Sequence, residues 1–546
     1  MLSYVRYAGT AGILVLSPLL IFQPEIRSEP RGQQPTAAPQ QGQPAQDPGR
    51  AGGPDGGRGP AGQPGRGGRG NPGAMLYTER CAGCHGVDIS GGRAPSLFDD
   101  VWTRVKTDED MARIIADGVP QTEMFPMRDM LTEEQIWQLV TYIRTAAGNM
   151  KPRPEFVADP DGLVLASEKH SFRMEVVTRE LETPWGLAFL PDGRILVTER
   201  PGRLRVLQNG KLLPPVTGTP RVWERQDAGL FDVEVHPQYE KTGWIYLSYS
   251  EPLPNYTPPP PPPEGAAPPS PGRGGRGPQP PGIPSMTVIV RGKINAANEW
   301  VDQEFIYRPD SPDLYTTNNT HFGSRFIFDR AGHLFYSIGE RGVVMDAQDL
   351  SKPTGKIHRV HDDGRVPKDN PFVNREGALP TIWSYGHRNP QGFAWDPVSG
   401  KLWSSEHGPQ GGDEINIIEP GKNYGWGVIT SGIQPGITKR AEEGMEPPIV
   451  YYTPTIAPSG IAFYAGDRFP NWKNNLFVTG LAGQQLRRLE TSGDTVAHQE
   501  VLFNHLGRVR DVVVGPDGHL YLLLQTPGQP MAASTPGILA RMVPVK

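Results

Sequence analysis

The 546-residue sequence predicts two folded domains, a small all-α domain followed by an all-β six-bladed propeller. Three observations predict this organisation. The only two cysteines lie in one pentapeptide ahead of an amphipathic segment, six strand–turn–strand units recur after residue 172, and proline- and glycine-rich tracts flank or interrupt these parts. A chain of this length holds more than one core, and its net charge of −5 offers no basic face for nucleic acid.

The first 29 residues resemble an export segment. Arg6 precedes an apolar stretch over 8–22 that Pro18 interrupts, which is short for a membrane span and typical of a secretory signal peptide. An uncleaved N-terminal anchor stays an alternative, because no clear small-x-small cleavage site follows. In either case we expect a periplasmic or secreted protein, with a membrane tether if the segment is retained.

Two tracts have a composition that does not build a packed core. Residues 30–73 are almost wholly Pro, Gly, Gln, Ala and Arg, and residues 252–284 include six consecutive prolines. Such segments are disordered or adopt polyproline II. We therefore expect a disordered linker over 30–73, a disordered insertion over 252–284, and a second linker over 151–171 between the folded domains.

The pentapeptide from Cys81 to His85 reads CAGCH, the signature of covalent c-type haem attachment. Two thiols at this spacing can add to both vinyl groups of one porphyrin, while the adjacent imidazole binds the iron. A thioredoxin-like redox pair is disfavoured by the histidine that follows and by the lack of a flanking strand–turn–helix pattern. We predict one haem c, covalently bound through Cys81 and Cys84 with His85 as an iron ligand.

A helix is predicted to end this domain. Thr132 and Gln135 form a capping box, and apolar residues recur at positions 136, 139, 140 and 143, one face of an amphipathic helix. Together with the haem motif, this helix resembles the small class I cytochromes c. The resemblance places a cytochrome c domain at 74–150.

The second iron ligand is predicted on the loop before this helix, where three methionines lie. In class I cytochromes c the ligand is a methionine in a Thr-x-Met-Pro-like turn, and His/Met coordination raises the haem potential, which suits an electron acceptor. Met124 is favoured. One phenylalanine separates it from the proline, so Met127 stays an alternative, and Met130 is assigned to core packing.

From residue 172 onward the sequence changes to short apolar strands. A unit recurs in which a small residue leads a strand, a Pro/Asp/Gly turn follows, and a second strand completes it. Its copies begin at Gly186, Gly229, Ser324, Gly392, Gly460 and Asp511. Six copies predict six blades over 172–546, and the excess length between copies must form loops, where propellers carry their sites.

Six ordered motifs in this region resemble the soluble pyrroloquinoline quinone (PQQ) sugar dehydrogenases, the family of glucose, aldose sugar and sorbosone dehydrogenases. They are TPWG at 183–186, THFGSR at 320–325, YGHRNPQG at 385–392, EHGPQGGDE at 406–414, NYGW at 423–426 and GRVRD at 507–511. The resemblance covers nearly all of 172–546. It implies a six-bladed propeller with PQQ and calcium on one face, and oxidation of an aldose at C1 to its lactone.

The resemblance implies roles for five residues around PQQ. His321 matches the general base that takes the proton of the anomeric hydroxyl. Arg388 and Asn389 match residues near the reactive quinone oxygens, where a fixed cation stabilises developing charge. Arg508 and Arg510 match partners of the PQQ carboxylates, a role that suits the planar guanidinium.

The resemblance also implies two calcium ions. Gly408 and Pro409 match positions whose backbone carbonyls hold the calcium bound to PQQ, where a hard cation acts as a Lewis acid. Glu414 and Tyr424 match ligands of a second, structural calcium.

The substrate side departs from the family pattern. Gln226 is one residue out of register with a family glutamine near the sugar, which leaves Asp227 in the aligned place. Ala482 stands where glucose dehydrogenases carry a PQQ-binding lysine, and Thr453 replaces a tryptophan that covers the cofactor. Both changes bear on PQQ affinity and sugar preference.

The two domains together predict an electron path. Sugar oxidation releases two electrons at once and a haem accepts one, so the attached cytochrome could oxidise the reduced cofactor in two steps. It would then pass the electrons to a soluble cytochrome, a quinone or an oxidase. A calcium-dependent propeller lactonase, or a non-catalytic sugar- or partner-binding propeller joined to an electron-transfer cytochrome, stays an alternative.

Overall fold

The computed structural model describes residues 71–545 apart from 98–103, 152–153, 258–281 and 528–533. The predicted signal segment over 1–29, residues 30–70 of the predicted linker, and most of the predicted insertion over 252–284 lie outside the described residues. In the part of the chain that is described, no helix is both long and apolar enough to cross a membrane.

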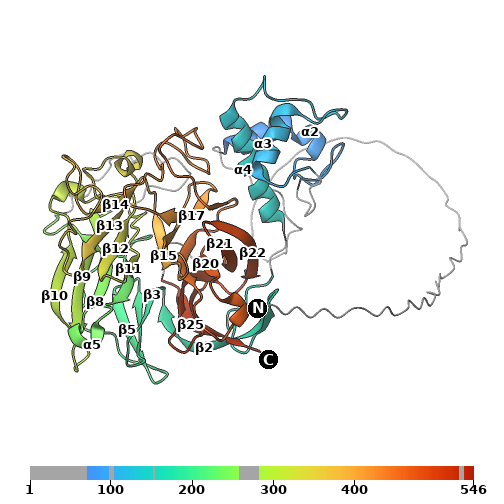
Figure 1. The fold of residues 1–546 in the computed structure, drawn as a ribbon. Helices are drawn as coiled ribbons and strands as arrows, with labels where there is room; N and C mark the ends of the chain where they lie inside the picture. Colours follow the sequence, from blue (N-terminus) through green and yellow to red (C-terminus); the bar gives the residue numbers. More distant parts are fainter. Residues whose placement is uncertain (1–70, 98–103, 152–153, 258–281, 528–533, 546) are drawn as a thin grey trace, which may run out of the picture. The chain divides into compact units, whose positions relative to one another are not determined.

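The N-terminal domain is helical (Figure 1), as the haem motif and the amphipathic pattern predicted. Its helices are α1 (Pro72–Arg80), α2 (Ala82–His85), α3 (Asp108–Asp117) and α4 (Glu133–Met150). The first helix starts inside the range predicted as disordered linker. Asn71 caps it, its Oδ1 accepting from Ala74 N at 3.2 Å, and Pro72 takes the first helical position, where no N–H is needed.

The haem-motif residues lie on and before the short helix α2. The Nδ1 of His85 is 3.0 Å from the carbonyl oxygen of Pro95, which fixes the ring and leaves Nε2 for the iron. Met124 is half-buried and Met127 is 4 % exposed within the helical core. The assignment of Met130 to core packing is wrong. Met130 is 46 % exposed, because the turn in which its N–H donates to Met127 O directs the Met127 side chain inward instead.

The C-terminal domain is a six-bladed propeller, which confirms the predicted fold class. Five blades are four-stranded antiparallel sheets. Their strands are β3 (Pro184–Phe189), β4 (Ile195–Glu199), β5 (Arg203–Gln208) and β6 (Lys211–Leu212); β7 (Leu230–Val235), β8 (Ile245–Pro252), β9 (Ser285–Ile294) and β10 (Trp300–Tyr307); β11 (Phe326–Phe328), β12 (His333–Ile338), β13 (Lys356–His361) and β14 (Ile382–Tyr385); β15 (Pro390–Trp395), β16 (Leu402–Glu406), β17 (Asp413–Ile418) and β18 (Val450–Tyr452); and β19 (Pro458–Phe463), β20 (Leu476–Gly480), β21 (Gln485–Ser492) and β22 (Thr495–Phe503).

The sixth blade closes the ring by joining the two ends of the domain. It holds β23 (Arg508–Val514), β24 (Leu520–Gln525), β25 (Pro536–Pro544), β2 (Ser171–Glu182) and β1 (Val164–Ala166). β2 pairs with β25, so an N-terminal strand completes the C-terminal blade. β1 pairs with β2 and lies inside the predicted 151–171 linker, which is therefore ordered at this point as an edge strand.

Each repeat supplies the innermost strand of one blade. These strands are β3, β7, β11, β15, β19 and β23, and each contacts the next around the ring, with β23 meeting β3. Apolar residues from neighbouring blades fill the spaces between sheets, as where Leu196 and Leu204 pack with Val233 and Leu247. Burying each such side chain contributes about 1.5–3 kcal/mol. The loops that precede the inner strands all open toward one end of the central axis and build the site described next.

Candidate active site

A pocket of about 250 Å³ lies where the loops before the inner strands converge. Every blade contributes to it. The residues that carry its polar groups are Arg200, Asp227, His321, Asn389, Gln391, His407, Arg508, Arg510 and Gln525, with Trp185, Phe231 and Phe322 as aromatic walls. We call this the cofactor pocket. Its volume approaches the range of about 300–1,000 Å³ typical of small-molecule sites.

His321 and Glu340 form a hydrogen-bonded pair at the pocket. The β11–β12 hairpin brings them together, since His321 precedes β11 and Glu340 follows β12. The Nδ1 of His321 contacts Glu340 Oε1, and the Glu340 side chain is 2 % exposed. Gly339 permits the approach, because a Cβ there would lie 2.2 Å from the carbonyl oxygen of His321. With Nδ1 occupied, the free Nε2 can accept a proton, as a general base must.

Arg341 holds the loop that carries His321. Its guanidinium donates to the carbonyl oxygens of Asn318 at 2.6 Å, Ser285 at 3.2 Å and Thr320, and it lies 3.5 Å from the ring centre of Phe322. Burial lowers the pKa of Arg341 to about 9. Neither Glu340 nor Arg341 was predicted from the sequence. The only local signal is that they directly follow an apolar strand and a glycine.

Arg388 and Asn389, which were predicted beside the cofactor, lie directly before β15. The Nη1 of Arg388 donates to His407 O at 3.0 Å, its guanidinium lies 5.2 Å from the ring centre of Trp426, and its Nε is buried with no hydrogen-bond partner among the described residues. Asn389 Oδ1 accepts from Gly323 N at 3.0 Å, which ties this strand to the His321 loop. Asn389 lines the cofactor pocket, whereas Arg388 lines the smaller pocket beside it.

Two arginines form a cationic wall of the cofactor pocket. Arg508 and Arg510 lie two residues apart on β23, and both line the pocket. No carboxylate of the described residues lies within ion-pair distance of either. Burial, together with the charge of Arg508, lowers the pKa of Arg510 to about 9, and burial also lowers the pKa of Arg508. Arg510 Nη1 donates to the neutral Gln391 Oε1 at 3.2 Å. A buried cation without an anionic partner is unfavourable, so this wall fits a ligand that carries carboxylates.

Of the two residues predicted to lie near the substrate, only one lines the cofactor pocket. Asp227 lines the cofactor pocket. Gln226 does not line it, and its carbonyl oxygen accepts from Arg200 Nη1 at 2.7 Å instead. Ala482 is also absent from the lining, which its neighbour Leu481 joins.

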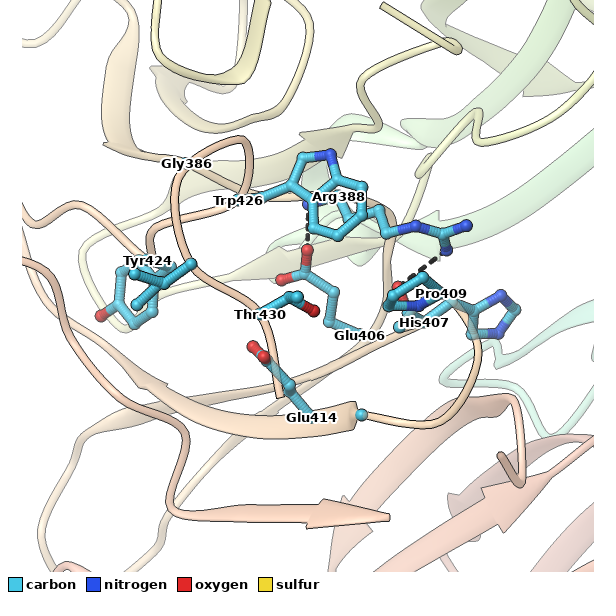
Figure 2. Close-up of a pocket in the computed structure, with 12 residues that line it drawn as sticks. Gly386, Arg388, Glu406, His407, Pro409, Glu414, Tyr424, Trp426 and Thr430 are labelled. Carbon is cyan, nitrogen blue, oxygen red and sulfur yellow. Dashed lines mark hydrogen bonds between the residues drawn. The ribbon is translucent and has the colours of Figure 1, made fainter. Parts of the chain in front are cut away.

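A second pocket of about 10 Å³, the cation pocket, adjoins the first and shares His407 with it. Figure 2 shows Glu406, Glu414 and Thr430 around it. Glu406 and Glu414 face each other across β16 and β17, an arrangement that is destabilising when both are charged. Burial, and then the charge of Glu406, raise the pKa of Glu414 to about 8. The predicted residues Gly408 and Pro409 also line this pocket.

These groups fit a hard cation. The buried Glu406 and half-buried Glu414 carboxylates, beside backbone carbonyls, offer the oxygen ligands that Ca²⁺ prefers. Tyr424 contributes at most its carbonyl oxygen, because its hydroxyl donates to Ile417 O at 2.5 Å and points away from Glu414 in Figure 2. No group of three or more His, Cys, Asp or Glu side chains in the described ranges could hold a metal, so a calcium here would rely on carbonyl oxygens as well.

Comparisons with known proteins agree with this geometry. Residues 181–532 match the family model described as Glucose / Sorbosone dehydrogenase, and residues 68–143 match Cytochrome C oxidase, cbb3-type, subunit III. Aldose sugar dehydrogenase YliI of Escherichia coli (strain K12) is 40 % identical over 360 residues, which cover 64 % of this chain and 89 % of that protein.

Two solved structures extend the likeness. The soluble aldose sugar dehydrogenase from Escherichia coli in its apo-form is 36 % identical with a TM-score of 0.59, covering 68 % of this chain and 100 % of that one. The PQQ-bound form of aldose sugar dehydrogenase from Streptomyces coelicolor is 25 % identical with a TM-score of 0.50, covering 68 % and 98 %. The chain therefore belongs to the glucose/sorbosone dehydrogenase family of oxidoreductases and carries a cytochrome c domain, of the kind found in cbb3-type oxidase subunit III, before its propeller.

Proposed function

We propose that this protein oxidises an aldose at C1 to its lactone with PQQ and Ca²⁺, and that the electrons pass to its own haem c. The observation that carries the proposal is the carboxylate-free wall of Arg508 and Arg510 beside the His321–Glu340 pair. An anionic cofactor would neutralise the two arginines. A sugar hydroxyl would give its proton to His321.

The residues of the chain divide the chemistry. His321 takes the proton of the C1 hydroxyl on Nε2, and Glu340 stabilises the imidazolium that forms. Asp227 lies where it can accept a hydrogen bond from another sugar hydroxyl. PQQ, when bound, supplies the quinone that accepts the hydride from C1. Removal of one proton and one hydride converts the hemiacetal to the lactone, so two electrons must leave the site in each turnover.

Arg388, Arg508 and Arg510 would hold the cofactor, and the fixed Arg388 cation would stabilise negative charge that develops on it. Glu406, Glu414 and the carbonyl groups of Gly408 and Pro409 would hold calcium. Asn389 would keep the quinone side of the pocket aligned with His321 through its bond to Gly323.

The haem is the proposed exit for electrons. Cys81, Cys84 and His85 would bind it, with Met124 as the proposed second ligand and Met127 as the alternative. Only thirteen residues, 151–163, connect α4 to β1. A short covalent tether keeps the effective concentration of each domain near the other high. Haem attachment to two thiols also supports the proposal that the protein works outside the cytoplasm, where an external acceptor would then oxidise the haem.

Reconstitution tests the proposal. The full-length haem protein is loaded with PQQ and Ca²⁺ and mixed with a panel of aldoses, while dye reduction, lactone formation and the haem spectrum are recorded. Sugar-dependent dye reduction with stoichiometric lactone supports the dehydrogenase, and haem reduction in stopped-flow mixing supports the internal electron path. Turnover with dye but an unreduced haem would refute the electron path alone. Hydrolysis of lactones without reduction would indicate a lactonase, and neither activity with PQQ bound would indicate a binding propeller.

A further inference from the structure

A further cavity, distinct from the cofactor pocket and the cation pocket, lies on the propeller axis. It measures about 520 Å³ and is lined by the same six inner strands, closer to their C-terminal ends. The cofactor pocket is lined by residues at or before the start of each strand, such as Trp185 and His321, whereas this cavity is lined by residues further along, such as Phe189 and Ile327. We call it the channel cavity.

A buried ion cluster closes the channel cavity on the side of the cofactor pocket. Arg325 Nη1 lies 3.1 Å from Asp232 Oδ1 and 3.1 Å from Asp511 Oδ2, so it joins β7 to β23 across the axis. The equivalent positions in two other repeats are Gly186 and Gly460, where a Cβ would lie 2.6 Å and 1.9 Å from these aspartate side chains. The two glycines therefore leave room for the cluster, which forms a charged floor.

One repeat differs from the others in the next inward-facing row. Two residues beyond the floor position, the other five strands carry Ala188, Ile327, Ala394, Ala462 and Val513. The second repeat carries Glu234 instead. Because side chains two apart on a strand share a face, Glu234 points into the cavity on the same side as Asp232.

Nothing in the described residues pairs with the Glu234 carboxylate, which belongs to no hydrophobic cluster and makes no hydrogen bond or ion pair there. The charged groups that face it are Asp232 on its own strand, and Arg325 and Asp511 across the floor; β3, β15 and β19 present only alanines at its level. His236, at the far end of the same strand, is 3.5 Å from Asp362. Desolvation, and then the charge of Asp232, raise the pKa of Glu234 to about 8.

The walls are apolar and partly aromatic. Phe189, Trp395 and Phe463 line the cavity together with valine and isoleucine side chains. An apolar, partly aromatic wall in the same cavity as a carboxylate suits an alkylated ammonium ion. One donor of the floor, Arg325 Nη2, is buried without a hydrogen-bond partner among the described residues.

We propose that the channel cavity is a binding site for a small organic cation, an ammonium group on an apolar body, with Glu234 as its counter-ion. The site is separate from the cofactor pocket, since the Asp232–Arg325–Asp511 cluster stands between them. The proposal does not depend on which sugar is oxidised, or on PQQ being the cofactor.

Benzyltrimethylammonium is a suitable probe, because its charge does not change with pH. Titration calorimetry with the full-length protein, loaded with haem, PQQ and Ca²⁺, should show one saturable site at pH 8.5. Glu234→Gln should weaken binding ~10-fold or more, the effect of losing a charged partner. Glu240→Gln, an exposed carboxylate on α5 (Tyr239–Thr242) of the same blade, should leave binding unchanged. Neutral benzyl alcohol should bind far more weakly.

The pH dependence gives an independent readout. The cation binds the ionised carboxylate, so affinity should fall ~10-fold for each pH unit below about 8 in the wild type and stay flat in Glu234→Gln. Ala462→Phe, which adds bulk to the cavity wall on β19 and keeps Glu234 on β7, should abolish binding and covers the case in which Glu234→Gln fails to fold. Absence of saturable binding to the wild type would overturn the proposal. Wild-type affinity in both cavity variants, or displacement of the probe when PQQ is added to PQQ-free protein, would also overturn it.

Discussion

The cofactor pocket and the channel cavity are built on the same six strands and differ in almost every chemical respect. The first is lined by loop and strand-start residues with three arginines and two histidines. The second is lined by residues that are apolar except for Glu234, His236 and the Asp232–Arg325–Asp511 floor. Only the strands are constrained by the repeated fold. The contrast shows that the loops at one end of a propeller can vary widely. At the other end, one charged residue differs clearly from the apolar residues at the same position in the other five repeats.

The floor between them links the two ends. The Arg325 guanidinium lies 4.6 Å from the ring centre of Trp185, and the Arg510 guanidinium lies 5.4 Å from the same ring. Trp185 therefore stands between the structural cluster on one side and the cofactor wall on the other. The buried charges of Asp232 and Asp511 are compensated by Arg325, so removing that arginine alone would leave two aspartates unpaired.

The largest effect is expected at the pocket end, from loss of the proposed base. His321→Gln should lower the kcat of PQQ- and Ca²⁺-loaded protein by about 10²–10⁴-fold, the usual contribution of a general base. Steady-state dye reduction with the preferred aldose measures it. Retention of PQQ binding, followed by absorbance, is the control for intact structure. Near-wild-type kcat in this variant would exclude His321 as the base.

The cofactor wall gives the second effect. Arg510→Ala should weaken PQQ binding roughly 10–100-fold, because hydrogen bonds to charged groups contribute about 1.5–3 kcal/mol. Fluorescence titration of PQQ into cofactor-free protein checks it. Arg365→Ala removes an arginine whose side chain is 75 % exposed and should leave the affinity unchanged. Equal PQQ affinity in both variants would show that the carboxylates of the cofactor are held elsewhere.

Much of the fold was predictable because each blade repeats the same local pattern. The closure of the ring was not, since β2 and β25 meet only through pairing between the two ends of the domain, for example Phe172 with Pro544. The local sequence of neither strand indicates which strand it pairs with. For the same reason the 151–171 segment resembled a linker although part of it pairs with β2.

In the pocket, motifs predicted residues that stand in distinctive sequence, and the fold brings His321, Asn389, Arg508 and Arg510 to one cavity. Glu340 was not predicted from the sequence, because a glutamate after an apolar strand is common. Only the β11–β12 register brings it to His321. Glu234 could have been found by aligning the six repeats row by row, since a charged residue in an apolar row contradicts the local pattern.

The third effect concerns positioning of the base. Glu340→Gln keeps the shape of the side chain but loses the charge that stabilises a protonated His321, so kcat should fall about 10-fold. Steady-state dye reduction checks it. Glu340→Asp, which keeps the charge, should restore kcat in part. An unchanged kcat in Glu340→Gln would reduce Glu340 to a packing role.

The smallest effect belongs to the channel end. Glu234 has a pKa of about 8 in the folded protein, above the ordinary value near 4.5, so between these values the folded state holds a proton that the unfolded state has released. Stability from this group is therefore present at low pH and is lost as pH rises toward 8. Glu234→Gln does not titrate, so the difference in Tm between wild type and variant should move by a few degrees in favour of the variant from pH 5 to pH 8. Glu240→Gln provides the matched exposed control in the same calorimetric scans. A pH-independent difference in Tm would mean that Glu234 is already ionised in the folded protein and paired with a cation. Added benzyltrimethylammonium would then fail to raise the Tm of the wild type.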